Sequence, residues 1–182
     1  LAVAELTVGL ILNLLRKISY MDRNIRNEHW KKSMCNILSG KKVGIIGFGR
    51  IGKKVAGLLK AFECKVSYYD IMNEVSDSGI ERVELDEILE SSDIVSIHVS
   101  LKELLIGDVE IKKMKKGACL VNVSRGVVVN EEALYCALRD GNLSGAAIDV
   151  FEQEPYSGPL KELDSVILTP HIGSYALETR VE

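Results

Sequence analysis

The sequence has few of the residues that would indicate a metal-binding or disulfide-bonded protein. Its 182 residues contain four cysteines and three histidines. No two cysteines form a C-x-x-C pair, so the pattern predicts no zinc site. Proline is also scarce, with three residues, and no low-complexity segment or linker is visible. Because the cysteines are expected to be reduced and no signal-peptide pattern is present, we expect a cytoplasmic protein.

Two further absences argue against membrane and nucleic-acid partners. The most apolar run, residues 1–15, is shorter than the roughly 20 residues that span a bilayer, and Glu5 and Asn13 interrupt it. The net charge of -3 is distributed without a large basic patch, so nucleic-acid binding is not expected. The apolar run has helical spacing and predicts a helix covered by the domain itself or by a second subunit. It leads us to expect a homodimer.

Apolar strand patterns alternate with helical patterns along most of the chain. Helices are predicted at 50–62, 85–90 and 131–139, and a polar connector at 23–39 precedes the first strand. The six predicted strands cover residues 42–46, 65–69, 94–99, 118–123, 145–150 and 166–169. This alternation predicts an α/β fold with a doubly wound parallel sheet, and with an N-terminal helix before the first strand.

A glycine-rich turn follows the first predicted strand. Gly47, Gly49 and Gly52 form the pattern G-x-G-x-x-G, and a predicted helix begins within it. Between a strand and a helix, this pattern is typical of dinucleotide binding, because it lets the backbone approach a pyrophosphate closely. The amides of Arg50 and Ile51, at the helix N-terminus, would face the negative charge of the pyrophosphate.

The second predicted strand ends at Asp70, 18 residues after Gly52. A carboxylate at this position can accept hydrogen bonds from the hydroxyls of the adenosine ribose. It would repel a 2′-phosphate, and no arginine follows it closely in the sequence. The predicted cofactor is therefore NAD rather than NADP.

Several segments together resemble the D-2-hydroxyacid dehydrogenases, and they occur in that family's order. They are residues 2–6, 47–52, 122–126, 148–155 and 168–173. The resemblance implies a Rossmann fold and an NAD-dependent enzyme, with phosphoglycerate favoured as substrate by family frequency only. In the family this domain is inserted within a substrate domain. We therefore expect residues 1–182 to be an NAD-binding domain excised from a longer chain, with the substrate-binding domain largely absent.

The resemblance also implies catalytic roles. Arg125 would hold the carboxylate and keto oxygen of the substrate, His171 would be the general acid/base, and Glu154 would hydrogen-bond that histidine. Asp149 would lie near the nicotinamide carboxamide. The chemistry agrees, because a guanidinium matches a carboxylate in a fork and a histidine can supply a proton near neutral pH.

Other residues are expected beside the cofactor, and one loop departs from the family. The resemblance places His98, Val123 and Gly173 at the cofactor site. After the third strand the family's usual Pro-Leu-Thr stretch is replaced by Ser100-Leu101-Lys102, and the following loop is a few residues shorter. Because that loop lies beside the cofactor in the family, the change bears on cofactor affinity and on the order of the next helix.

Alternative functions remain open at the level of the sequence. The first hypothesis is an oxidoreductase that acts on a 2-hydroxy or 2-keto acid. The second is an NADH-sensing binding module of the corepressor type, which retains comparable catalytic residues. Nucleotide-dependent partner binding without turnover would favour the second. A third, a relative of adenosylhomocysteinase, is disfavoured by the combination of Arg125, Glu154 and His171.

Overall fold

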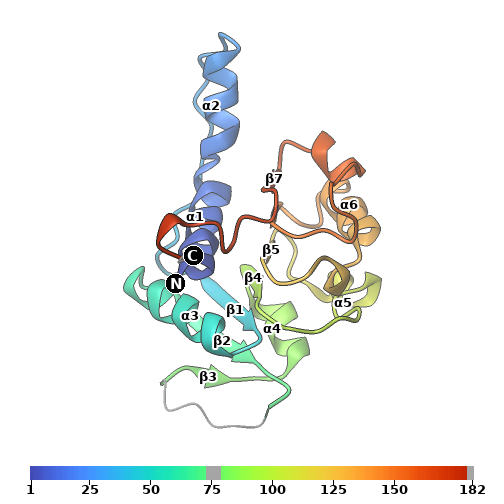
Figure 1. Cartoon of the computed structure of the whole chain (residues 1–182). Coiled ribbons are helices and arrows are strands. Elements are labelled where there is room, and N and C mark those ends of the chain that lie inside the picture. Colours follow the sequence, from blue (N-terminus) through green and yellow to red (C-terminus); the bar gives the residue numbers. More distant parts are fainter. Residues whose placement is uncertain (73–78, 180–182) are drawn as a thin grey trace.

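The computed structural model describes residues 1–72 and 79–179, and the strands in these residues form one parallel sheet (Figure 1). The strands are β1 (Lys42–Ile46), β2 (Lys65–Tyr69), β3 (Glu81–Arg82), β4 (Ile94–Ile97), β5 (Cys119–Asn122), β6 (Gly145–Ile148) and β7 (Val166–Leu168). Their spatial order is β3-β2-β1-β4-β5-β6-β7, and each neighbouring pair is parallel. The predicted doubly wound sheet is confirmed.

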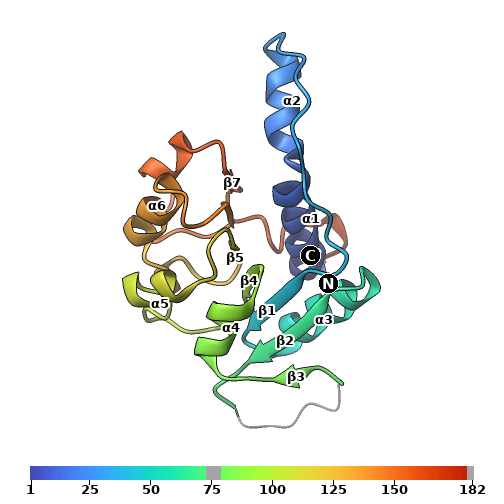
Figure 2. The same ribbon diagram turned by 180° about the vertical axis from the view of Figure 1, so that it is seen from behind.

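Helices cover both faces of this sheet (Figures 1 and 2). The α-helices are α1 (Ala2–Arg16), α2 (Ile18–Arg26), α3 (Arg50–Ala61), α4 (Leu85–Ser91), α5 (Asp108–Lys113) and α6 (Glu131–Arg139). Short 3-10 helices lie at η1 (Gly126–Val128), η2 (Pro159–Glu162) and η3 (Leu177–Thr179). Helices α1 and α3 pack on one face, whereas α4, α5 and α6 pack on the other. The predicted N-terminal helix before the first strand is confirmed.

The two faces of the sheet explain why the strands are almost continuously apolar. Val43 and Ile45 of β1 pack in the same cluster as α1 and α3. Ile46, the next residue along the strand, packs in the cluster on the α4 side. All three side chains are fully buried. Because successive side chains of a strand point to opposite faces, a sheet covered on both sides requires apolar residues at every position.

The apolar first helix is covered mainly by the domain itself. Ala4, Leu10 and Ile11 of α1 are buried in the same cluster as α3 and the central strands. Lys17 ends this helix with a left-handed φ of 51°, and α2 then projects away from the body (Figure 1). The predicted connector at 23–39 is therefore wrong in its first residues, which are helical up to Arg26.

The structure also shows one strand and one loop contact that the sequence did not predict. The short strand β3 adds a seventh strand to the six predicted, at the outer edge of β2. The shortened loop after Ser100 is held by two backbone hydrogen bonds, in which the amides of Leu105 and Ile106 donate to the Val128 carbonyl oxygen. The helix α5 begins directly after it. Within the described residues, none of the helices has both the length and the apolar character needed to cross a bilayer.

Candidate nucleotide and acid–base site

The glycine-rich turn between β1 and α3 leaves open space where the sequence predicts a pyrophosphate. Gly47 has a φ of 93°, and a Cβ there would lie 2.8 Å from the carbonyl carbon of His98. A Cβ on Gly52 would overlap the carbonyl oxygen of Gly47. A Cβ on Gly49, by contrast, would meet no atom within 4 Å. Gly47 and Gly52 are thus required by the fold, whereas Gly49 borders empty space at the start of α3.

The start of α3 provides donors for an anion at this place. Gly49 is the N-cap of the 12-residue helix, and Arg50 and Ile51 are its first two residues. First-turn amides have no acceptor within their own helix, and the helix dipole adds partial positive charge there. These residues therefore fit the pyrophosphate of a dinucleotide, which supplies negative oxygens and needs close backbone approach.

Asp70 lies directly beside the glycine-rich turn. Its Oδ2 accepts a hydrogen bond of 2.6 Å from the Phe48 amide, and its Oδ1 accepts one of 2.9 Å from the Met72 amide. Phe48 also stacks on Tyr68 of β2, with ring centroids 3.7 Å apart. The acid predicted to bind the ribose is therefore held next to the turn predicted to bind the pyrophosphate.

The structure adds one neighbour to the charge argument for NAD over NADP. An arginine does lie beside Asp70: Nη2 of Arg82 donates to the Asp70 carbonyl oxygen at 3.1 Å. Arg82 belongs to β3, which pairs with β2 at the sheet edge. Sequence reasoning missed this neighbour because it did not predict β3.

Glu154 and His171 form a hydrogen-bonded pair, as expected. Nδ1 of His171 lies 3.0 Å from Oε2 of Glu154, and the two side chains are 50% and 40% exposed. The hydrogen bond with His171 holds the pKa of Glu154 below its ordinary value, with a further contribution from the Phe151 amide. A carboxylate that is ionised can only accept, so Nδ1 carries the proton and Nε2 is the ring nitrogen left for a substrate.

His171 sits on a strained turn that Asp149 holds in place. Its φ is 54°, a left-handed conformation that costs roughly 1–2 kcal/mol for a residue with a Cβ. The buried Asp149 carboxylate accepts hydrogen bonds from the Thr169 hydroxyl, the Ile172 amide and the Gly173 amide at 2.6–2.9 Å. Strain of this kind persists only where the surroundings fix the backbone, and it is typical of functional sites.

Arg125 is exposed on the neighbouring loop after β5. Its Nη1 donates to the Ser124 carbonyl oxygen at 2.6 Å, and the Asn122 side chain donates to the carbonyl oxygen of Arg125. The next residue, Gly126, packs so closely on the Phe151 backbone that a Cβ there would overlap it. The Arg125 loop is thus in direct contact with the loop that carries Glu154.

His98 is not suited to the acid/base role. Its Nε2 lies 2.9 Å from the Ser96 hydroxyl, and its Nδ1 is buried without a partner in the part of the chain that the structure describes. Burial lowers the pKa of His98 to about 4, so the ring is neutral near pH 7. Its backbone contacts Gly47, which keeps it at the edge of the glycine-rich turn.

The remaining expected cofactor residues are both covered. Val123 is 8% exposed and belongs to the apolar cluster under α1 and α3. Gly173 is buried and donates to Asp149. Their contact with a cofactor stays a prediction, as does the contact of Asp149 with a nicotinamide ring.

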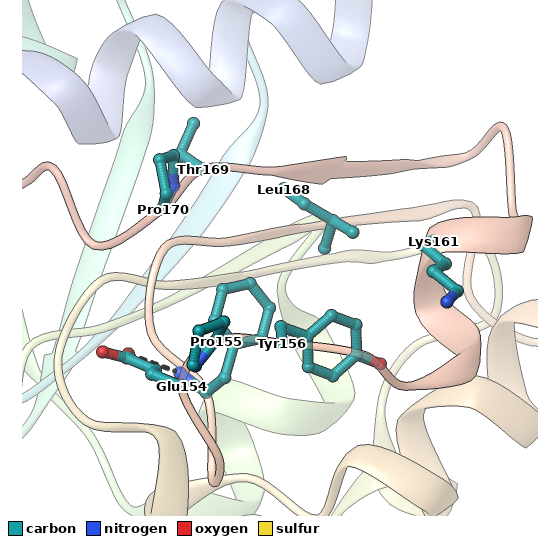
Figure 3. Close-up of a pocket in the computed structure, with 8 residues that line it drawn as sticks. Glu154, Pro155, Tyr156, Lys161, Leu168, Thr169 and Pro170 are labelled. Atoms are coloured by element: carbon teal, nitrogen blue, oxygen red, sulfur yellow. Dashed lines mark hydrogen bonds between the residues drawn. The ribbon is translucent and has the colours of Figure 1, made fainter.

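A cavity adjoins Glu154, and half of its lining residues come from the long irregular loop at residues 152–163. It has a volume of about 650 Å³ and lies between the loop after β6 and the end of β7. Its walls are mostly apolar, and Glu154 and Lys161 lie at opposite ends of it (Figure 3). Tyr156 stacks on Phe151 in its wall, with ring centroids 4.4 Å apart. None of the residues of the glycine-rich turn lines this cavity.

Together, these features define a dinucleotide-binding domain with an acid–base pair on the same edge of its sheet. Comparison with known proteins identifies the family. The family model described as D-isomer specific 2-hydroxyacid dehydrogenase, NAD binding domain, matches residues 8–173. The chain therefore belongs to this family of NAD-binding domains.

Individual relatives agree with the family. The chain is 47% identical to a glyoxylate reductase of Thermofilum pendens and 42% identical to a D-3-phosphoglycerate dehydrogenase of Haemophilus influenzae, in each case over 98% of the chain. It covers 57% of the first relative and 47% of the second. It also resembles the structure of D-lactate dehydrogenase from Aquifex aeolicus complexed with NAD and lactic acid, with a TM-score of 0.89 and 32% identity, covering 98% of the chain and 61% of that structure.

Proposed function

We propose that the chain is the NAD-binding domain of an oxidoreductase that transfers a hydride between NAD(H) and a D-2-hydroxy acid or its 2-keto acid. The observation that carries the proposal is the Glu154–His171 pair, whose 3.0 Å hydrogen bond uses Nδ1 of the ring and, among the residues that the structure describes, leaves Nε2 for a substrate. A dinucleotide-binding turn alone is compatible with many reactions. A histidine fixed by a carboxylate adds a proton donor, which reduction of a carbonyl requires.

Each residue of the proposed site has a defined part in the reaction. When bound, NADH supplies the hydride that reduces the keto carbon. Arg125 binds the substrate carboxylate through its planar guanidinium, which has the geometry to engage two oxygens at once. His171 donates a proton from Nε2 to the substrate oxygen, while Glu154 accepts from Nδ1 and fixes the ring orientation. Asp149 positions this histidine through the turn that it holds.

The rest of the enzyme is part of the same proposal. Because the chain covers about half of its relatives' length, we infer that a substrate-binding domain belongs to the working protein and selects the hydroxy acid. Closure of two domains would exclude water and orient the acid. On its own, the 182-residue chain is expected to bind NADH but to turn over little or no substrate.

A homodimer is supported by exposed apolar residues on and after the projecting helix α2, rather than by the buried stripe of α1. Ile25 lies on α2, and Trp30, Met34 and Ile37 lie on the segment that returns from it to β1. Trp30 is 82% exposed and Met34 is 92% exposed, and exposed apolar groups of this size are typical of association surfaces. Sedimentation velocity tests this: a monomer at micromolar concentration would exclude the dimer.

A cytoplasmic location is supported by the four free thiols.

Calorimetric titration of the chain with NADH and adenosine diphosphate ribose tests the cofactor site. Saturable binding of both supports the proposal, and failure of both overturns it. For the reaction, a longer form of the protein that includes the substrate domain is assayed with glyoxylate, hydroxypyruvate, pyruvate and 3-phosphohydroxypyruvate. The control is His29→Gln, because His29 is exposed on the segment after α2, away from the glycine-rich turn and the loops after β6 and β7. Turnover of at least one substrate that is lost in His171→Gln, but not in His29→Gln, supports the assigned acid/base.

A further inference from the structure

Arg82 lies next to the residue that is proposed to read the adenosine ribose. In the pairing of β2 with β3, Arg82 is opposite Tyr68, two residues before Asp70. Its side chain extends toward the carboxyl end of the sheet, where Nη2 donates to the Asp70 carbonyl oxygen. A positive charge therefore lies at the same strand end as the Asp70 carboxylate.

The hydrogen-bonding capacity of the Arg82 guanidinium is only partly used by its partners. Nη1 pairs with Oε1 of Glu84 at 3.3 Å, but the Glu84 side chain is 76% exposed, so this ion pair is weakly held. Nε is buried and has no partner among the residues that the structure describes. A guanidinium has five N–H donors, and a buried one left unpaired is unfavourable. Because Nε is buried and the Arg82 side chain is 29% exposed, the terminal nitrogens Nη1 and Nη2 are the donors that Arg82 would offer to an anion beside Asp70.

NADP differs from NAD at this point of the molecule by a 2′-phosphate on the adenosine ribose. Asp70 disfavours that phosphate by charge repulsion, whereas a guanidinium binds phosphate in a fork. Glu84 competes with the phosphate for the same group. We propose that Arg82 is a nucleotide-specificity residue that supplies the counter-charge for an adenosine 2′-phosphate, so that the chain accepts NADPH as well as NADH. This rests on the proposed function.

The test compares two variants with opposite expected signs. Arg82→Gln is expected to weaken NADPH binding by about tenfold or more, the loss of one charge-assisted hydrogen bond, while NADH binding changes by less than about twofold. Glu84→Gln releases the guanidinium and is expected to tighten NADPH binding alone. Arg139→Gln is the control, because Arg139 is also ion-paired but lies on α6. Affinities are measured by calorimetry, and thermal melts verify that each variant folds.

Several outcomes overturn the inference. Equal weakening of NADH and NADPH in Arg82→Gln means that the arginine only holds the end of β2. Unchanged affinities mean that it does not reach the phosphate, and unchanged NADPH binding in Glu84→Gln excludes the competition. These results leave the proposed function intact if wild-type protein binds NADH. If wild-type protein binds neither NADH nor adenosine diphosphate ribose, the proposed function fails and this inference fails with it.

Discussion

Replacement by alanine should affect two glycines of the same turn differently: Gly49→Ala should weaken NADH binding, and Gly52→Ala should lower stability. Gly49 borders open space, so Gly49→Ala is expected to fold normally, with a loss of stability below about 1 kcal/mol from the poorer N-cap. The added methyl group would stand where the pyrophosphate approaches. Losing one charge-assisted hydrogen bond, about 1.5–3 kcal/mol, corresponds to roughly 10- to 150-fold weaker NADH binding.

Gly52→Ala is expected to act on stability. A Cβ there overlaps the Gly47 carbonyl oxygen, which is backbone and cannot rotate away. Overpacking costs about 1–3 kcal/mol, and the better helix propensity of alanine returns up to about 1 kcal/mol. Because the overlap is with backbone, the overpacking cost is expected at the upper end of its range, so the net loss of about 2–3 kcal/mol lowers Tm by roughly 4–12 °C for a chain of this size.

A third glycine on α3 provides the control. Gly57 is exposed and a Cβ there would meet no atom within 4 Å, so Gly57→Ala should raise Tm slightly and leave NADH affinity unchanged. Calorimetry measures the affinity and a thermal melt the stability of each variant. If Gly49→Ala bound NADH as tightly as wild type, the assignment of this turn to the pyrophosphate would be refuted. If Gly52→Ala melted at the wild-type temperature, the close packing of this turn against α3 would be wrong.

Three further predictions concern titratable groups. The pKa of His98, about 4 in the fold against 6.5 when unfolded, favours the neutral ring, so its stabilisation is present above pH 6.5 and is lost as pH falls toward 4. Urea unfolding should show that His98→Gln loses about 3 kcal/mol less than wild type between pH 7 and pH 4, and parallel pH profiles would contradict this. Asp149→Ala leaves three donors without their acceptor and should lower the free energy of unfolding by about 3 kcal/mol. Thr169→Val, which removes one of those donors, should cost clearly less, and equal losses in denaturant melts would exclude the anchoring role. In His171→Gln the pKa of Glu154 should rise toward its ordinary value in a carboxyl NMR titration, and no change would show that the hydrogen bond does not form in solution.

The sequence predicted the elements whose signals are local. The strands that carry the site are short apolar runs buried on both faces, and the glycine spacing between a strand and a helix is typical of a dinucleotide-binding turn. The pairing of Glu154 with His171 came from the family resemblance, and the structure brings the two side chains within hydrogen-bonding distance.

The elements that were missed depend on contacts outside their own segment. The two-residue strand β3 has no apolar alternation and exists because its backbone pairs with the edge of β2. Helix α2 buries none of its residues, and its last residues are polar enough to be taken for a connector. An ion pair between Arg26 and Asp22 supports it locally. The left-handed backbone of His171 could not be predicted either, because it follows from an aspartate 22 positions earlier in the chain.

The strand order also sets the length of the ligand that the site can hold. Asp70 follows β2 and Asp149 follows β6, and these strands are four neighbour spacings apart in the sheet, or about 19 Å. A mononucleotide placed at either end would leave the other end empty, so only an extended two-part molecule can engage both. The same separation means that substitutions beside Asp70 would leave unchanged the geometry of the residues proposed to transfer the proton, on the loops after β6 and β7. If both sites act as proposed, adaptation to a new cofactor and adaptation to a new reaction can proceed independently in this domain.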